Sequence, residues 1–265
     1  MSKTLVQQQF GAHAAAYATS QVHAKGASLA RVVELVAPQK SWRALDIATG
    51  AGHTAAALAP HVAHVIASDI TTEMLAEADK LAKERGLENL ETAVADAEAL
   101  PFADGAFELV TSRIAPHHFP HPERFVAEVA RVLKRGGVFA LIDNIAPDAQ
   151  STPGFTEAEL AEAAATYNAF EKLRDPSHGR CLGMGEWARL MGACGFSVRH
   201  AERIPKDMEF DPWARRLGCD EPTIARLAEM LAKAKPALAA FLKPRTLDGV
   251  VWFTLDEAIL IADKA

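Results

Sequence analysis

The sequence predicts an α/β protein built on a doubly wound sheet that is mostly parallel, with an antiparallel last strand. Short apolar runs of β type alternate with amphipathic helical runs between Arg43 and Asp143. A glycine turn follows the first of these strands, and acidic residues follow the next two. Strands that alternate with helices of this length are joined by right-handed crossovers. The sheet is therefore expected to be parallel, with helices on both faces.

The core is expected to contain five strands. They are Ala44–Ile47, His64–Ser68, Leu90–Ala95, Phe107–Ser112 and Val138–Asp143. Three helices are expected between them, over Thr54–Ala59, Glu73–Arg85 and Glu123–Lys134. Thr71 suits the N-cap of the second helix, and Gly86 suits the left-handed position after its end. Gly136 and Gly137 are expected to end the third helix.

The flanking segments are expected to be additions to one core, so that 1–265 is a single domain. Residues 1–40 form an N-terminal helical cap, with a helical run over Gln7–Val36, and 41–147 form the core. Residues 148–265 supply the remaining strands, with a helical insertion at about 206–248. The elements expected there are helices over Thr156–Leu173 and Met184–Cys194, a strand over Phe196–Ile204, a helical stretch over Pro212–Leu242, and strands over Val250–Thr254 and Ala258–Ala262.

Composition excludes several classes of protein. The formal net charge is −6 and no Lys/Arg cluster stands out, which disfavours nucleic acid as a partner. Cys181, Cys194 and Cys219 show no CxxC spacing, so neither a disulfide framework nor a metal site is expected. No signal peptide and no membrane-spanning run are visible. A reduced, cytoplasmic setting fits these features.

The first strand runs directly into a glycine turn, Asp46 to Gly52. Glycines are needed there because such a turn takes unusual dihedral angles and brings the backbone close to a ligand. The segment from Gly50 to Ala55 also satisfies the loose dinucleotide pattern GxGxx(G/A), so the turn alone leaves a nicotinamide dinucleotide open.

Three acidic residues favour a cationic cofactor. Asp69 ends the second strand, where a carboxylate can accept hydrogen bonds from both ribose hydroxyls. Asp96, with Ala97, follows the third strand, where it could receive an adenine amino group. Asp46 precedes the glycines, and a negative charge there suits a sulfonium and an α-ammonium but not a pyrophosphate. Each acid alone could be a cap or turn residue. All three, however, lie at the carboxyl ends of successive strands, which is the edge where open α/β sheets bind their ligands.

Four segments carry a family resemblance over Arg43 to about Pro147: LDIATGAGHTAAALA, VIASDITTEML, VADAEALPFADGAFELVTSRIAPHHF and FVAEVARVLKRGGVFALID. They resemble the class I S-adenosylmethionine-dependent methyltransferases of the ubiquinone/menaquinone-biosynthesis type (methyltransferase type 11), which have a Rossmann-like fold. One departure is Ala48, at the first position of the family's glycine motif. Its methyl group is expected to be tolerated if the local φ is negative.

The resemblance implies S-adenosylmethionine as cofactor and S-adenosylhomocysteine as product. Asp69 would hold the ribose, Asp96 and Ala97 would frame the adenine, and Met74 or Ile70 would cover its face. The cofactor-binding residues that it implies are Tyr17, Asp46, Ala48, Thr49, Gly50, Gly52, Asp69, Ile70, Met74, Asp96, Ala97, Glu98, Ser112 and Arg113. Tyr17 belongs to an N-terminal segment that would close over the cofactor, and an ordinary packing role stays open for it.

Two histidines are candidates for catalysis. His117 and His118 lie in the segment that the resembling family places beside the transferred methyl group. Either could act as a base, because imidazole titrates near neutral pH; the alternative is that one packs or caps a helix and the other is exposed. Arg113 could pair with an acidic substrate group or form a structural ion pair. A small-molecule acceptor, methylated at carbon or oxygen, is expected.

The acceptor side is less defined by the sequence. Trp187, Trp213 and Trp252 could line an apolar acceptor pocket or belong to the core. The insertion carries an apolar stripe that could cover the acceptor site or form a homodimer surface. That stripe consists of Ile224, Leu227, Met230 and Leu231.

Two alternatives to a methyltransferase remain. One is a non-catalytic module that binds S-adenosylmethionine or S-adenosylhomocysteine. The other is an NAD(P)-dependent oxidoreductase that uses the same glycine turn, although no Tyr-x-x-x-Lys pair is present.

Overall fold

The computed structural model describes residues 3–11 and 27–265, which form two compact units. Unit 1 comprises Met1–Asp143, Ala188–Glu202 and Ile259–Ala265, and unit 2 comprises Asn144–Trp187 and Arg203–Ala258. Our grouping of 1–265 as a single domain stays a prediction.

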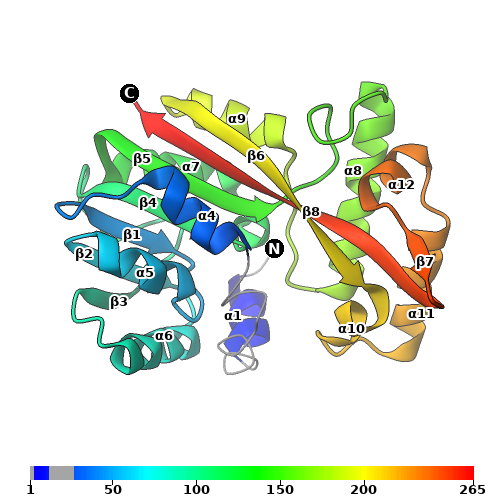
Figure 1. Cartoon of the computed structure of the whole chain (residues 1–265), viewed down its shortest axis with the longest axis horizontal. Coiled ribbons are helices and arrows are strands. Elements are labelled where there is room, and N and C mark those ends of the chain that lie inside the picture. The colour runs from blue at the N-terminus through cyan, green and yellow to red at the C-terminus, as the bar shows by residue number, and fades with distance from the viewer. Residues whose placement is uncertain (1–2, 12–26) are drawn as a thin grey trace. The chain divides into compact units, whose positions relative to one another are not determined.

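Unit 1 contains most of the sheet, whose strands follow the order β3-β2-β1-β4-β5-β8-β6, while parts of β6 and β8 belong to unit 2 (Figure 1). The bounds are β1 Arg43–Ile47, β2 His64–Asp69, β3 Leu90–Val94, β4 Phe107–Arg113, β5 Leu133–Asn144, β6 Phe196–Glu209 and β8 Val250–Lys264. The pairs β3-β2, β2-β1, β1-β4 and β4-β5 are parallel. In Figure 1, β8 runs against β5. The predicted fold class is therefore confirmed.

Strand order reverses between β1 and β4, which places a ligand crevice at their carboxyl ends. Helices cover the sheet, with α4 in front of it and α7 behind it in the view of Figure 1. The helices that contribute to unit 1 are α1 Lys3–Gly11, α4 Ala27–Val36, α5 His53–Leu58, α6 Thr72–Arg85, α7 Pro122–Val132 and α9 Met184–Ala193, with one-turn helices η1 Ala59–His61 and η2 Pro116–His118. The central strands β1, β2 and β4 are almost entirely buried, whereas the edge strands β3 and β6 are partly exposed.

The boundary between α7 and β5 differs from the prediction. We expected the helix to reach Lys134 and the strand to start at Val138, but α7 ends at Val132 and β5 begins at Leu133. Leu133 pairs with Phe107, whereas Val138 pairs with Leu109, so residues 134–137 bulge out of the ladder. The glycines therefore serve a bulge inside a strand; they do not end a helix.

The end of the chain also differs, because the two predicted strands are one continuous strand, β8. Asp256 and Glu257 lie between the two predicted strands, and both are buried. Each is paired within unit 2: Arg203 Nη1 lies 3.2 Å from Asp256 Oδ2, and Lys206 Nζ lies 2.7 Å from Glu257 Oε2. Because Arg203 and Lys206 of β6 compensate the charges of Asp256 and Glu257, strand β8 can continue through these two buried residues.

Unit 2 packs its helices around an aromatic core. Thr156 and Glu159 form a reciprocal capping box at the start of α8 (Glu157–Arg174). Trp213 stacks on Phe170 of α8 with ring centroids 5.0 Å apart, and Phe253 packs edge-on against Trp213. The remaining elements are α10 Phe210–Arg215, α11 Glu221–Ala232, α12 Pro236–Leu242 and β7 Arg245–Leu247. Within the helical stretch predicted over Pro212–Leu242, Pro222 lies at the start of α11 and Pro236 at the start of α12.

The apolar stripe of the insertion is core. Ile224, Leu227 and Leu231 are buried, and their helix α11 packs against α8. Met230, the fourth residue of the stripe, is half-buried, so most of the stripe packs inside unit 2, and a homodimer stays a prediction. Trp187 and Trp213 are likewise buried, and Trp252 is half-buried.

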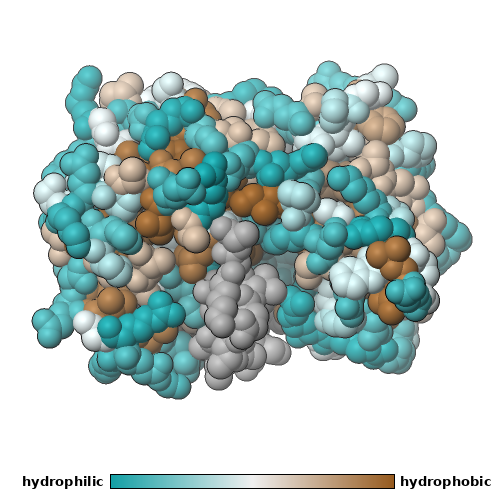
Figure 2. All heavy atoms as spheres, in the orientation of Figure 1, coloured by the Kyte–Doolittle hydropathy of each residue, from teal (hydrophilic) through white to brown (hydrophobic). Residues whose placement is uncertain are grey.

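The visible surface is mainly hydrophilic, with small apolar groups such as the end of the β7–β8 hairpin (Figure 2). Leu247, Val250 and Val251 are the large apolar side chains exposed there. Within residues 3–11 and 27–265, none of the helices has the length and apolar character needed to cross a membrane.

Candidate functional site

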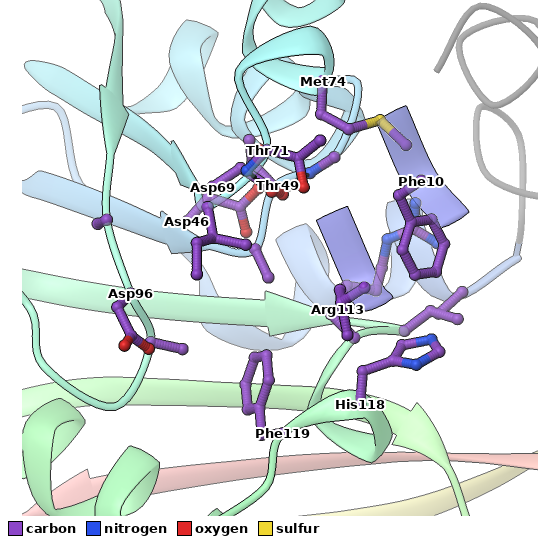
Figure 3. A pocket seen from close by; sticks show the side chains of 18 of the residues that line it. Phe10, Asp46, Thr49, Asp69, Thr71, Met74, Asp96, Arg113, His118 and Phe119 are labelled. Carbon is purple, nitrogen blue, oxygen red and sulfur yellow. Dashed lines mark hydrogen bonds between the residues drawn. The ribbon is translucent and has the colours of Figure 1, made fainter. Parts of the chain in front are cut away.

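A pocket of about 1070 Å³, including its open mouth, lies in unit 1 at the carboxyl ends of the parallel strands. Its walls are the turn after β1, the end of β2, the segments after β3 and β4, and helix α1. Figure 3 shows Asp46 and Asp69 close together on one wall, Asp96 on a separate strand end, and Phe10 facing His118. This is the edge of the sheet where the sequence predicted a ligand.

The turn after β1 is held in a left-handed conformation at three positions. The φ values are +51° at Ala48, +55° at Gly50 and +82° at Gly52. The amide of Thr49 donates to the carbonyl of Ser68 at 2.9 Å, which anchors the turn to β2. We expected the methyl group of Ala48 to be tolerated if its φ is negative, but this φ is positive. The turn imposes the left-handed conformation there, and Ala48 carries the steric cost of its methyl group.

The two glycines of the turn have different tasks. A Cβ built on Gly50 would meet no atom within 4 Å, so this glycine faces open space in the pocket. A Cβ on Gly52 would lie 2.8 Å from the Cβ of Ala78, because α5 begins close against α6. Gly50 thus leaves the backbone accessible to a ligand, and Gly52 permits the close packing of helices.

Asp46 is a buried carboxylate at the base of the pocket. Its Oδ2 accepts a hydrogen bond from Thr49 Oγ1 and its Oδ1 accepts one from Thr111 Oγ1, both at 2.6 Å. Burial raises the pKa of Asp46 to about 6, against the lowering effect of the two threonine hydroxyls. A cation placed in the pocket would compensate this charge.

Asp69 ends β2 and holds the backbone of two turns. Its Oδ2 accepts from the amide of Gly50 at 3.0 Å, and its Oδ1 accepts from the amide of Thr71 at 2.9 Å. Burial raises the pKa of Asp69, and these amides oppose the shift. Thr71 occupies the N-cap of α6 as predicted, but its side chain makes no capping hydrogen bond.

Asp96 is covered from the N-terminal side by α1. Lys3 Nζ lies 2.6 Å from Asp96 Oδ2 and 2.9 Å from Glu98 Oε2. Burial acts to raise the pKa of Asp96, but the hydrogen bonds from Lys3 and from the amide of Glu98, together with the charge of Lys3, outweigh it and the pKa is lowered. Gln7 Nε2 donates to the Ile70 carbonyl at 3.0 Å, so α1 forms one wall of the pocket.

The end of β4 and the segment after it supply the remaining cationic and imidazole groups. Arg113 Nε donates to Thr54 Oγ1 at 3.0 Å on the pocket wall. His118 lines the pocket and meets the ring of Phe10 edge-on at 5.0 Å. His117 lies behind it, with its ring 4.2 Å from that of His118, and its Nδ1 is 2.6 Å from Asp143 Oδ1.

Most predicted site residues meet in this pocket. Those that line it are Asp46, Ala48, Thr49, Gly50, Asp69, Ile70, Met74, Asp96, Ala97, Glu98, Arg113 and His118. Gly52, Ser112 and His117 do not line it, and the hydroxyl of Ser112 donates to the Ile47 carbonyl at 3.0 Å. Tyr17 lies outside the described residues.

Sequence reasoning missed Lys3 and Phe10, which reach the pocket from α1. No local pattern marks them, because their place depends on how α1 packs against α6. It also missed His53 and Thr54 at the start of α5, although their position directly after the glycine turn could have indicated them.

The chain matches the model of the methyltransferase domain over residues 45–141. It is 35% identical to YcgJ, an uncharacterised methyltransferase of Bacillus subtilis, over 209 residues, which are 79% of this chain and 78% of the relative. The ubiquinone/menaquinone biosynthesis C-methyltransferase of Brucella canis is 29% identical over 193 residues, 71% of this chain and 66% of the relative.

A solved structure agrees with these matches. A candidate methyltransferase of Bacillus halodurans shares 33% identity and superposes with a TM-score of 0.81, covering 90% of this chain and 99% of that one. Sequence and architecture thus lead to the same family. The chain belongs to the class I methyltransferases with this methyltransferase domain.

Proposed function

We propose that the pocket binds S-adenosylmethionine and that the chain transfers its methyl group to a small-molecule acceptor, at carbon or oxygen. The observation that carries the proposal is the line of three carboxylates, Asp46, Asp69 and Asp96, along one pocket at the carboxyl ends of successive strands. The C-methyltransferase of Brucella canis is a relative with this type of reaction.

The residues present fit this cofactor. The open space over Gly50 lets a ligand approach the backbone of the turn. The Asp69 carboxylate keeps lone pairs beyond the two that hold backbone amides, so it can also accept ribose hydroxyls. Asp96 and the backbone at Ala97 would frame the adenine, while Met74 and Ile70 supply apolar cover. Lys3 also holds the carboxylate of Asp96.

When bound, S-adenosylmethionine supplies an electrophilic methyl group on a positively charged sulfur. The task of this chain is then to bind, orient and desolvate. Asp46, buried between two threonine hydroxyls, would place a negative charge near the cationic part. Arg113, whose charge acts on Asp46, would serve the cofactor carboxylate or an acidic acceptor group.

A base is needed when the acceptor carries a proton that must leave. His118 lines the pocket and His117 packs against it, so both of the predicted candidates lie at the end of β4 next to the site. The pair supports an acceptor that is methylated at an ionisable position.

The alternatives are less well supported. A nicotinamide dinucleotide would bring its pyrophosphate towards Asp46 and Asp69, and like charges repel. A non-catalytic binding module would need no histidines at the pocket. The oxidoreductase would differ from a methyltransferase in the cofactor that it binds. The non-catalytic module would bind the same cofactor but transfer no methyl group.

Calorimetric titration of the full chain with S-adenosylhomocysteine and with NADH tests the proposal. We expect micromolar binding of S-adenosylhomocysteine and no binding of NADH. Transfer of the labelled methyl group of S-adenosylmethionine to any member of a small-molecule acceptor panel would then exclude the non-catalytic reading. Binding of NADH alone would contradict the proposal.

A further inference from the structure

One ammonium group bridges two carboxylates on the pocket wall of unit 1. Lys3 Nζ lies 2.6 Å from Asp96 Oδ2 and 2.9 Å from Glu98 Oε2. All three residues line the pocket, Lys3 from α1 and the two acids from the segment after β3. Because both carboxylates contact the same nitrogen, they lie close together, and their like charges would repel without a cation between them.

Helix α1 brings this ammonium group to the two acids. Lys3 and Gln7 are four residues apart on the helix, so their side chains lie on one face of it. Gln7 Nε2 donates to the carbonyl of Ile70 at 3.0 Å, and Phe10 on the next turn lines the pocket. The position of Lys3 is therefore set by a helix that is also anchored to the segment after β2.

The two acids are held unequally. The side chain of Glu98 is 4% exposed, and its Oε1 accepts from the amide of His121 at 2.7 Å. Asp96 is 32% exposed, and apart from Lys3 its carboxylate is held through Oδ1, by the amide of Glu98 at 3.0 Å. If the ammonium group were removed, repulsion would therefore turn Asp96 towards water, while Glu98 would stay in place.

Asp96 can still accept a hydrogen bond from a ligand. A carboxylate offers about four lone-pair sites, and Lys3 and the amide of Glu98 occupy two of them. Burial acts to raise the pKa of Asp96, but Lys3 and this amide outweigh it and the pKa is lowered. Because an ionised carboxylate only accepts hydrogen bonds, the remaining sites suit a ligand group that donates, such as an amino group on a purine ring.

We infer that Lys3 is a positioning residue that holds the Asp96 carboxylate towards the pocket and thereby sets the specificity for a purine with an exocyclic amino group. This rests on the proposed function. Lys3 acts through Asp96 and takes no part in methyl transfer. A purine that lacks the amino group leaves Asp96 without its partner and therefore binds more weakly. A chain that lacks the ammonium group loses this discrimination.

Calorimetric titration of the full-length chain tests the inference, with S-adenosylhomocysteine and with its 6-deamino analogue, which carries purine in place of adenine. The readout is the ratio of the two dissociation constants. We expect a ratio of about thirtyfold in the wild type, as one hydrogen bond to a charged acceptor would give. Lys3→Met should weaken S-adenosylhomocysteine, leave the analogue nearly unchanged, and reduce the ratio to about fivefold or less. Lys3→Arg keeps the cation and should restore most of the ratio.

Two results would overturn the role of Lys3. One is a ratio in Lys3→Met equal to that of the wild type. The other is tighter binding of S-adenosylhomocysteine by Lys3→Met, because that would show Lys3 competing with adenine for Asp96.

Gln7→Ala separates the positioning of Asp96 from the docking of α1. It removes the contact with the Ile70 carbonyl but leaves Lys3 and both acids in place. If α1 only covered the pocket, Gln7→Ala and Lys3→Met would weaken both ligands alike; we expect the ratio to fall in Lys3→Met alone. Lys233→Met breaks an ion pair of the same 2.6 Å length, with Glu229 in unit 2, and should change neither affinity.

The wild-type titration distinguishes the failure of this inference from that of the proposed function. No binding of S-adenosylhomocysteine by the wild type would refute the proposed function and the role of Lys3 with it. Tight binding by the wild type, together with a ratio that Lys3→Met leaves unchanged, would refute the role of Lys3 alone.

Discussion

The amide of Gly50 donates to Oδ2 of Asp69 at 3.0 Å, so the acid at the end of β2 holds the glycine turn at the end of β1. The other oxygen of the same carboxylate holds the start of α6 through the amide of Thr71. Asp69 is thereby fixed in place before any ligand arrives. This pre-organisation removes part of the ordering cost of binding.

The left-handed conformation of Ala48 predicts a stabilising substitution. Ala48→Gly removes the steric cost of φ +51° but loosens the unfolded chain, and the net gain should be about 0.5–1 kcal/mol in free energy of unfolding. Urea denaturation measures it. Ala56→Gly, inside α5, is the control and should lose about 1 kcal/mol. Destabilisation by Ala48→Gly would show that the turn does not strain this residue.

The close approach at Gly52 predicts a larger loss. Gly52→Ala would place a methyl group 2.8 Å from the Cβ of Ala78 as well as straining φ, and should cost about 2–4 kcal/mol in free energy of unfolding. Gly86→Ala shares the positive φ but meets no atom within 4 Å, so it should cost only about 1–2 kcal/mol. Adding Ala78→Gly should recover part of the difference. Equal losses at Gly52 and Gly86 would contradict the packing role.

The raised pKa of Asp46 predicts a pH dependence of cofactor binding. This pKa of about 6 lies above the ordinary value of 3.8, so at a pH between these two values the folded chain holds a proton here that the unfolded chain has lost. The contribution of Asp46 to stability is therefore greatest below the ordinary value and falls as the pH rises through about 6. A cationic ligand favours the carboxylate, so affinity for S-adenosylmethionine should rise over the same range and level off above it.

Calorimetric titrations between about pH 5 and pH 8 check this, with a slope approaching about tenfold per pH step on the acidic side. Asp46→Asn should bind more weakly at neutral pH and lose this dependence. An affinity for S-adenosylmethionine that stays constant with pH in the wild type would show that Asp46 carries no charge towards the ligand.

The parallel core could be predicted because its signals are local. Apolar runs, the glycine turn after β1 and Gly86 after α6 each specify their own conformation within a few residues. The acids at the strand ends could be placed in one pocket because parallel strands finish at one edge.

The rest depends on tertiary contacts that leave no local pattern. The continuity of β8 requires Arg203 and Lys206 on β6 to neutralise an acidic pair far along the chain. Lys3 reaches Asp96 only because α1 packs over the pocket, and Asp143 looks like an ordinary strand residue until it meets His117. The apolar side chains on α11 are likewise buried because α11 packs against α8, a contact that the sequence of α11 alone does not indicate.

The most direct test of the central claim is the affinity of S-adenosylhomocysteine for the wild type, Asp69→Asn and Glu84→Gln. Asp69 lines the pocket, whereas Glu84 lies exposed on α6, and both substitutions exchange a carboxylate for an amide of the same shape. We expect micromolar binding by the wild type and by Glu84→Gln, and a loss of about a hundredfold in Asp69→Asn, as two hydrogen bonds to a charged acceptor would give. Equal affinity in all three, or no binding by the wild type, would contradict the assignment of this pocket to the cofactor.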